Sequence, residues 1–401
     1  MKSDDRRGAS LPAKLGLAAL VSFAMVCLLE VALRRAGYRP LPHFFRGQND
    51  PLTVTGYFWI ADRNLGFRNR ALGSFRNREV LAAPLITSDA HGYRTTAGWS
   101  EEGHAPIVAF VGDSTTFCAE VEDSETGPSE VAKLLGRELP VRVLNAGVRG
   151  YNTVQAKRAL EEVLSRYSDV RAAVYLYTRN DDVENLDPVV YYPAKAPTMW
   201  RDPASGGMRE VEVTDPVVPW GESFAPEARP RALPARLLDE ARSRSALVEL
   251  SVVVLARWTA MPLALTSAVA LENGSVGPLR EGSAQWSAQL EWARRNGSDE
   301  ALEQLLRGMN EMCAARGVEF IAAEFGFGEP HPSSHFADLC RRAGVRFASL
   351  ADGFPGDARS YAAPTATGYD WHYGPDGTKA FARALAPELR AALRASRPAA
   401  E

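Results

Sequence analysis

The sequence predicts an α/β fold in which helices cover both faces of a five-stranded parallel sheet. Residues 107–111 form a short continuous apolar run, which is typical of a strand buried on both faces. Four further segments, at residues 141–144, 172–177, 318–325 and 345–350, are also predicted to be strands. Segments with helical periodicity lie between and after them, at residues 128–139, 153–166, 299–316, 334–342 and 375–393. Because parallel strands need crossover connections, this alternation indicates a doubly wound, three-layered sheet.

Residues at the element boundaries support this assignment. Gly112 ends the first strand, and Pro128 suits the first turn of the helix that follows. Ser298 is a candidate N-cap for the helix that stops at Gly317. Pro375 opens the last helix, which we expect to follow a loop.

Composition limits the classes of protein to consider. The chain has 401 residues, of which 46% are hydrophobic and 24% charged, and its net charge is −3. These fractions are those of a folded globular protein. At this near-neutral charge, the chain has no excess of basic residues of the kind that nucleic-acid binders carry. We therefore expect no nucleic-acid partner, and no motif indicates a cofactor.

The four cysteines are Cys27, Cys118, Cys313 and Cys340. No pair among them has the close spacing of zinc ligands, so we predict no metal site built on cysteine. Cys313 and Cys340 either pair in an exported domain or remain separate buried thiols on two helices, and the second reading is favoured.

An apolar N-terminal run predicts a transmembrane anchor. Residues 15–29 carry no charge, and residues 31–33 extend the run past Glu30 toward the roughly 20 helical residues that a bilayer core requires. Lys14 and Glu30 lie near its ends, where a charge can reach the interface. A cleaved signal peptide and a buried soluble helix are the alternatives. Basic residues on the two sides balance, so they do not decide the orientation.

The domain organisation follows from these patterns. Residues 1–36 form a tail, which is cytoplasmic if the following domain is exported, and the anchor, and residues 37–100 form a linker and an irregular extension with short β structure. Residues 101–396 form the α/β domain. The Pro-rich segment 187–298 interrupts its alternation and is predicted to be an insertion with a helical stretch at about residues 235–258.

The candidate chemistry begins at the turn Gly112-Asp113-Ser114, directly after the first strand. In a doubly wound sheet, ligands bind at the carboxyl ends of the strands. A serine hydroxyl needs a base, and His372 precedes the last helix, with Asp370 two residues earlier to orient it. His331 and His335 are spaced like metal ligands, but Pro332 interrupts any helix there, so no metal site is predicted.

Two further segments follow the second and third strands. Residues 145–151 include Gly150, and residues 178–181 include Asn180. A glycine presents an unobstructed backbone N–H group, and an asparagine presents an uncharged donor. Both suit an oxyanion hole, which acyl transfer requires.

In this order the residues resemble the SGNH (GDSL-type) hydrolase family. Ser114 matches the nucleophile, Gly150 and Asn180 match the oxyanion donors that act with the Ser114 N–H group, and His372 and Asp370 match the base and its acid. The resemblance implies a flavodoxin-like sheet. It covers residues 87–186 and 299–393, and residues 87–94 with the anchor resemble a bacterial membrane-anchored branch whose catalytic domain is exported.

The sequence departs from the family pattern at several positions. Asp370 precedes His372 by two residues, where the family commonly has three. Cys118 occupies a position where glycine is common, and we interpret it as a small buried residue. Arg179 is a candidate substrate contact, as is Asp113.

The resemblance implies a serine esterase that acts through an acyl-enzyme on O-acyl, and specifically O-acetyl, esters of envelope or extracellular polysaccharide. Two alternatives stay open: an O-acyltransferase that uses the same residues on a glycan acceptor, and a non-catalytic binding or assembly module with the same fold. Hydrolysis and transfer cannot be distinguished from sequence.

Overall fold

The computed structural model describes residues 11–35, 58–62, 64–77, 80–186, 197–202, 204–212, 247–248, 284–325, 334–350, 353–355, 358–365 and 368–395. The chain divides into two compact units, Met1–Arg46 with Arg229–Gly274, and Gly47–Ala228 with Ser275–Glu401. The first unit contains the helix α1 (Leu11–Arg35), in which Glu30 Oε2 accepts a hydrogen bond of 2.9 Å from Leu247 N. Of the helices described, none has the length and apolar character that crossing a membrane requires.

The second unit contains a five-stranded parallel sheet, which confirms the predicted fold class. Its strands are β5 (Ile107–Gly112), β6 (Arg142–Asn145), β7 (Val170–Tyr177), β10 (Glu319–Glu324) and β11 (Arg346–Ala348). They are ordered β6-β5-β7-β10-β11 and are all parallel. This is the flavodoxin-like order, whose topological switch point lies between β5 and β7.

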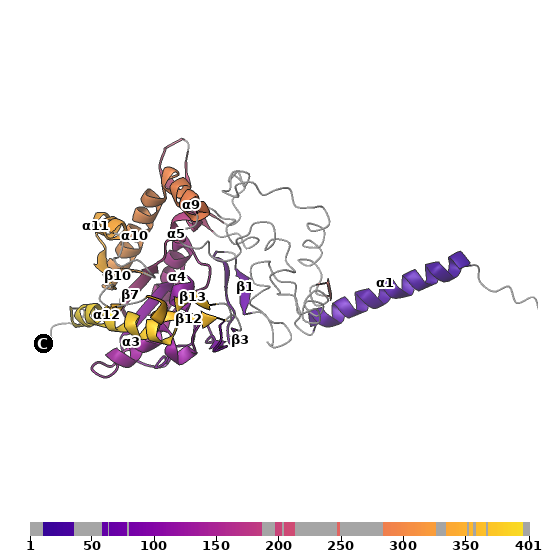
Figure 1. The fold of residues 1–401 in the computed structure, drawn as a ribbon, viewed down its shortest axis with the longest axis horizontal. Helices are drawn as coiled ribbons and strands as arrows, with labels where there is room; N and C mark the ends of the chain where they lie inside the picture. Colours follow the sequence, from indigo (N-terminus) through magenta and orange to yellow (C-terminus); the bar gives the residue numbers. More distant parts are fainter. Residues whose placement is uncertain are drawn as a thin grey trace, which may run out of the picture. The chain divides into compact units, whose positions relative to one another are not determined.

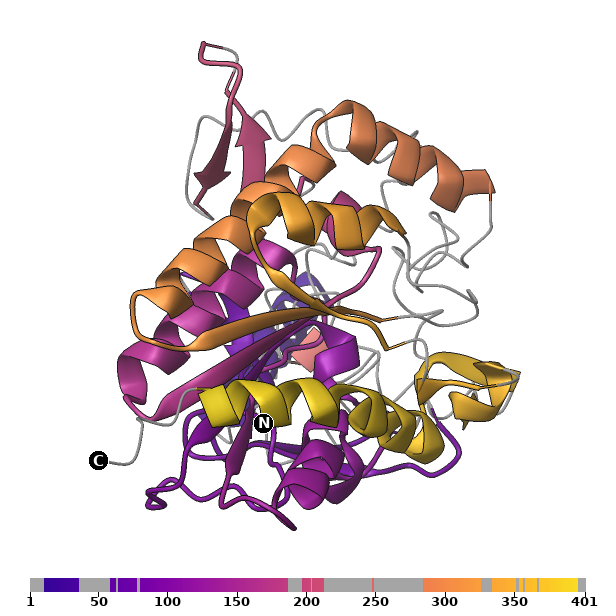
Figure 2. The same cartoon turned by 90° about the vertical axis from the view of Figure 1, so that its left-hand side faces the viewer.

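Helices cover both faces of this sheet (Figures 1 and 2). On one face α3 (Gly127–Leu135) packs against α12 (Pro375–Ala395), and on the other α4 (Thr153–Arg166) packs against α10 (Ser298–Ala314). The largest core cluster lies between the sheet and α3 and α12, and includes Phe110, Ile321 and Phe381. The helix α11 (Ser334–Ala343) packs beside α10.

The extension before the sheet forms short β structure, as predicted. The strand β1 (Trp59–Asp62) pairs with β2 (Gly66–Asn69), and β3 (Ser74–Arg76) pairs with β4 (Leu85–Thr87). Phe58 contacts Phe75 and Phe117, with ring centroids 4.9 and 5.8 Å apart. The extension therefore packs directly against the segment that follows β5.

The described part of the insertion contains a β-hairpin and a helix. The strand β8 (Thr198–Arg201) pairs with β9 (Met208–Val211), and α9 (Ala284–Arg295) follows later in the chain. Met199 and Met208 of the hairpin pack with Val154 and Leu305 of the flanking helices. The helical stretch predicted at 235–258 lies outside the described residues, except for residues 247–248, which are helical.

Two local predictions are wrong. The N-cap of α10 is Gly297, which has φ 92° and makes no side-chain capping bond, whereas Ser298 lies inside the helix and is buried. The segment before α12 is a β-hairpin rather than a loop, in which β12 (Ala362–Thr365) pairs with β13 (Gly368–Tyr373). Its last residue, Tyr373, packs on Phe325 and Phe354, which buries the end of the hairpin.

Candidate active site

The turn Gly112-Asp113-Ser114 connects β5 to the short helix α2 (Ser114–Phe117). Gly112 has φ 150°, and a Cβ atom there would clash with the Thr116 hydroxyl and lie 3.0 Å from the Leu176 carbonyl oxygen. Only glycine fits this turn without strain. Ser114 ends this turn as the first residue of α2, at the carboxyl end of the central strand β5, and it is 6% exposed.

The Asp113 carboxylate connects the segments after β5 and β7. Its Oδ1 accepts hydrogen bonds from the backbone N and the hydroxyl of Thr115, at 2.9 and 2.8 Å. Its Oδ2 accepts bonds from the Thr178 hydroxyl at 2.7 Å and from Asn180 Nδ2 at 3.3 Å. The Ser114 hydroxyl also donates to Oδ2, at 3.4 Å. Asp113, a predicted substrate contact, is thus buried and accepts bonds from the protein itself.

The end of β6 and the loop that follows it contact the backbone of α2. Asn145 Nδ2 donates a hydrogen bond of 2.9 Å to the Thr116 carbonyl, and Asn145 Oδ1 accepts one of 3.0 Å from Gly147 N. A Cβ atom on Gly147 would lie 2.7 Å from Phe117 N, so the loop approaches the helix backbone too closely for any other residue. Sequence reasoning missed Gly147, although it lies in the same glycine-containing segment as Gly150. Gly150 itself adopts φ 81°.

The loop after β7 begins a short helix, α5 (Asp181–Glu184), that carries buried acids. Tyr175 donates a hydrogen bond of 2.6 Å to Asp181, and Tyr177 donates one of 2.8 Å to Asp182. Burial, and then the charge of Asp113, hold the pKa of Asp181 well above its usual range. Burial also raises the pKa of Asp182 to about 6. Asn180 and Arg179 precede these acids and are half-buried.

His372 lies on β13, and its strand contacts α2, so the candidate base His372 and the candidate nucleophile Ser114 come from adjoining elements. His372 is buried, and its Nδ1 lies 3.3 Å from Oε1 of Glu120, which is also buried. Sequence reasoning missed Glu120. Asp370 occupies the same strand two residues earlier, and its side chain lies outside the described part of the chain.

The described thiols near the site and in the core are buried. Cys118 adopts φ 57° and its Sγ donates to the Thr115 carbonyl at 3.1 Å, and burial raises the pKa of its thiol to about 12. It is a small buried residue, as interpreted. Cys313 on α10 and Cys340 on α11 are free and buried, so the favoured reading of separate thiols is confirmed.

Two histidines, His331 and His335, have the sequence spacing of metal ligands. His335 Nε2 lies 3.0 Å from Asp299 Oδ1, and His331 falls outside the described residues. In the described ranges, no group of three histidine, cysteine or acidic side chains is arranged to hold a metal ion.

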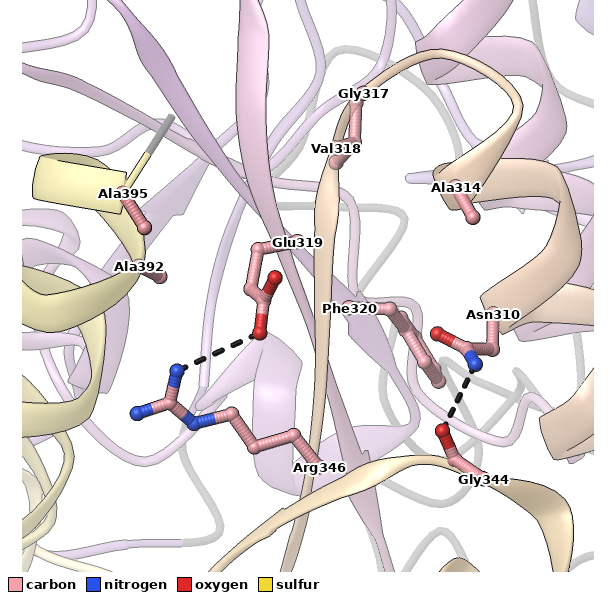
Figure 3. Close-up of a pocket in the computed structure, with 10 residues that line it drawn as sticks. All are labelled: Asn310, Ala314, Gly317, Val318, Glu319, Phe320, Gly344, Arg346, Ala392 and Ala395. Atoms are coloured by element: carbon pink, nitrogen blue, oxygen red, sulfur yellow. Dashed lines mark hydrogen bonds and ion pairs between the residues drawn. The ribbon is translucent and has the colours of Figure 1, made fainter. Parts of the chain in front are cut away.

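A hollow of about 450 Å³ lies at the opposite end of the sheet (Figure 3). Its lining includes Glu319 and Arg346, the first residues of β10 and β11, which form an ion pair of 3.4 Å. Asn310 Nδ2 donates a hydrogen bond of 3.0 Å to the Gly344 carbonyl across it. Because Ser114 and Asn180 lie beyond the carboxyl ends of their strands, this hollow is not part of the candidate site.

No family model matches the chain, and no curated protein matches it. Solved structures that are similar include the crystal structure of TesA, with 11% identity over 71% of this chain and 99% of that chain and a TM-score of 0.36. Two variants of the esterase AlinE4 are also similar, each with 12% identity over 75% of this chain and 100% of that chain, and with TM-scores of 0.29 and 0.28. Likeness at these TM-scores does not bear on function.

Proposed function

We propose that this chain is a serine hydrolase that acts on O-acyl esters, with Ser114 as the nucleophile and His372 as its base. The observation that carries the proposal is the position of Ser114 at the start of α2, at the switch point between β5 and β7, against the strand of His372. Ligands bind at this place in doubly wound folds. The resemblance to SGNH hydrolases assigns the same residues.

The reaction has two half-reactions in this proposal. The Ser114 oxygen forms a bond to the ester carbonyl carbon while its proton passes to Nε2 of His372, and the carbonyl π pair moves onto oxygen. The tetrahedral intermediate then breaks its bond to the leaving alkoxide, which takes the proton from Nε2. A water molecule repeats the sequence on the acyl-enzyme and releases the carboxylic acid.

The oxyanion is stabilised by the Ser114 and Gly150 backbone N–H groups and by the Asn180 amide. Asn180 Nδ2 is held 3.3 Å from Asp113 Oδ2, which keeps this donor beside the nucleophile turn. Donors fixed before the reaction stabilise the developing charge without reorganisation, and one such donor contributes about 10²–10³-fold in kcat.

We extend the proposal to O-acetyl groups of envelope or extracellular polysaccharide as the substrate. Incubation with an acetylated glycan tests this directly, because hydrolysis releases acetate into solution. Acetyl transfer to an added unacetylated glycan, without free acetate, would instead show that the chain is an acyltransferase with the same catalytic residues.

We also propose that α1 attaches the chain to a membrane, with the catalytic domain on the extracytoplasmic side. Large apolar residues are exposed along this helix: Leu20, Val21, Phe23, Met25, Val26, Leu28, Leu29 and Val31. A continuous set of exposed apolar residues is typical of a membrane or protein contact. Removal of residues 1–35 should move the protein from the membrane fraction to the supernatant, and unchanged fractionation would contradict the proposal.

The catalytic assignment is tested with Ser114→Ala and His372→Ala, assayed on p-nitrophenyl acetate. We expect each to lower kcat by about 10³-fold or more, because the two residues act as a unit. A fluorophosphonate probe should label the wild type and spare Ser114→Ala. Ser168→Ala, the same change at an exposed serine, is the matched control. Full hydrolysis by Ser114→Ala would refute the assignment.

A further inference from the structure

We infer that Glu120 is a carboxylate that orients His372, which makes Glu120 a positioning residue of the catalytic site. This inference rests on the function proposed above. Its basis is the pairing of two buried side chains: Glu120 Oε1 lies 3.3 Å from His372 Nδ1, with side-chain exposures of 1% and 3%.

The nitrogen that faces the carboxylate determines the chemistry. A carboxylate at Nδ1 keeps the proton on that nitrogen, which leaves the lone pair on Nε2 to accept the serine proton. When Nε2 takes that proton, the imidazolium is stabilised by the adjacent negative charge of Glu120. Glu120 remains ionised throughout and accepts no proton itself.

The loop that carries Glu120 is held from both sides. Arg94 donates hydrogen bonds to the Phe117 carbonyl at 3.3 Å and to the Val121 carbonyl at 2.9 Å. Asn77 Nδ2 donates a bond of 2.8 Å to the Ala119 carbonyl, next to Glu120. Because the backbone is held on each side of Glu120, the carboxylate has little freedom to move and can keep the imidazole of His372 in one orientation.

A buried carboxylate is destabilised unless opposite charges or donors surround it. The Arg94 guanidinium interacts electrostatically with Glu120, so this cation favours the ionised carboxylate that the positioning role requires. The other charged or titratable groups that interact with this cluster include Cys118, Asp113, Glu122 and Asp123. Cys118 remains a neutral thiol at physiological pH because burial raises its pKa to about 12.

Replacement of the charge without change of shape tests the inference. We expect Glu120→Gln in the full-length protein to lower kcat for p-nitrophenyl acetate by about 10²–10⁴-fold, with KM changed less than about 3-fold. The acid limb of kcat/KM should also move to lower pH, because loss of the adjacent negative charge makes the base easier to deprotonate. The exposed Glu102→Gln is the matched control and should retain kcat within about 3-fold. Asp370→Asn tests the acid that the family resemblance assigns, and a large loss of kcat there with wild-type kcat in Glu120→Gln overturns the inference.

The comparison with His372→Ala separates this inference from the function on which it rests. If Glu120 acts only through the imidazole, Glu120→Gln has no further effect in the His372→Ala background. Loss of activity in His372→Ala with wild-type kcat in Glu120→Gln overturns the role of Glu120 and leaves the proposed function standing. Wild-type activity in His372→Ala overturns the proposed function itself.

Two further outcomes are decisive. Glu120→Asp keeps the charge on a shorter side chain, so it should recover part of the lost kcat and return the acid limb toward the wild-type pH. If Glu120→Gln lowers the melting temperature and kcat together and leaves the acid limb in place, Glu120 is a structural residue and the inference is wrong.

Discussion

Arg94 provides a sharp test of how the site is held, because its guanidinium is fully buried and contacts the loop after α2 in several places. It donates to the carbonyl oxygens of Phe117 and Val121 and forms an ion pair with Asp123. Its charged carbon also lies 5.3 Å from the centre of the Phe117 ring. We consider Arg94→Met, which removes the charge and the donors but keeps a long apolar side chain.

The magnitude follows from what the substitution leaves behind. Two buried carbonyl groups lose a donor, at about 1–3 kcal/mol each. Asp123 loses its cation, and a broken buried pair costs about 3–5 kcal/mol. The Asp123 side chain is 22% exposed and also accepts a hydrogen bond from Thr87 N, so water and this donor offset part of the loss. We expect the free energy of unfolding to fall by about 3–5 kcal/mol in total.

Urea denaturation followed by circular dichroism at pH 7 measures this change. A thermal scan should show a melting temperature lower by about 6–20 °C, at roughly 2–4 °C for each kcal/mol in a domain of this size. Arg137→Met makes the same change at an exposed position and should shift the free energy of unfolding by no more than about 0.5 kcal/mol. A melting temperature for Arg94→Met within about 2 °C of the wild type would refute the reasoning.

Three further substitutions test the site and its surroundings. Asn180→Ala should lower kcat for p-nitrophenyl acetate about 10²–10³-fold and leave the melting temperature nearly unchanged, and an unaltered kcat would exclude its amide as an oxyanion donor. Gly112→Ala should lower the free energy of unfolding by about 2–5 kcal/mol in urea denaturation, whereas Gly207→Ala, whose Cβ atom would make only an ordinary contact of 3.7 Å with the Ser205 hydroxyl, should not. For Asp182, burial raises the folded-state pKa to about 6 from its ordinary value of 3.8, so ionisation opposes folding as pH rises through this window. The wild type should therefore lose stability relative to Asp182→Asn between about pH 4 and 6, by up to about 3 kcal/mol, and parallel stability profiles for the two proteins would contradict this.

The sheet was predictable because its signal is local and repeated. The strand β5 is a continuous apolar run, and each of its residues is buried, which is the environment that such runs indicate. The crossover rule then orders the strands as parallel without any knowledge of their partners. The placement of Ser114 and Asn180 at the carboxyl ends of β5 and β7 follows from the same rule.

The hairpin that carries His372 could not be predicted in the same way. Its partner strand, Ala362–Thr365, contains alanine and proline, which are poor strand formers, and the register shifts within the pair. Pairing here depends on tertiary packing of Tyr373 against aromatic residues from two other segments. Local sequence therefore indicates a loop where the fold forms a strand.

The N-cap of α10 was missed for a comparable reason. Gly297 adopts a positive φ, and a Cβ atom there would clash with the guanidinium of Arg201 on the hairpin β8–β9. The positive φ of Gly297 favours glycine at the N-cap position, and Ser298, the better capping residue by type, is placed one residue too late.

Glu120 illustrates the same limit at the site itself. Nothing near residue 120 in the sequence indicates a partner for its carboxylate, because His372 reaches it only through the hairpin that was taken for a loop. The backbone that holds it depends on Arg94 and Asn77, which precede the nucleophile strand and lie outside the parallel sheet. The N-terminal extension therefore supports the candidate site: the sheet places Ser114, and the extension holds the loop whose carboxylate lies beside His372.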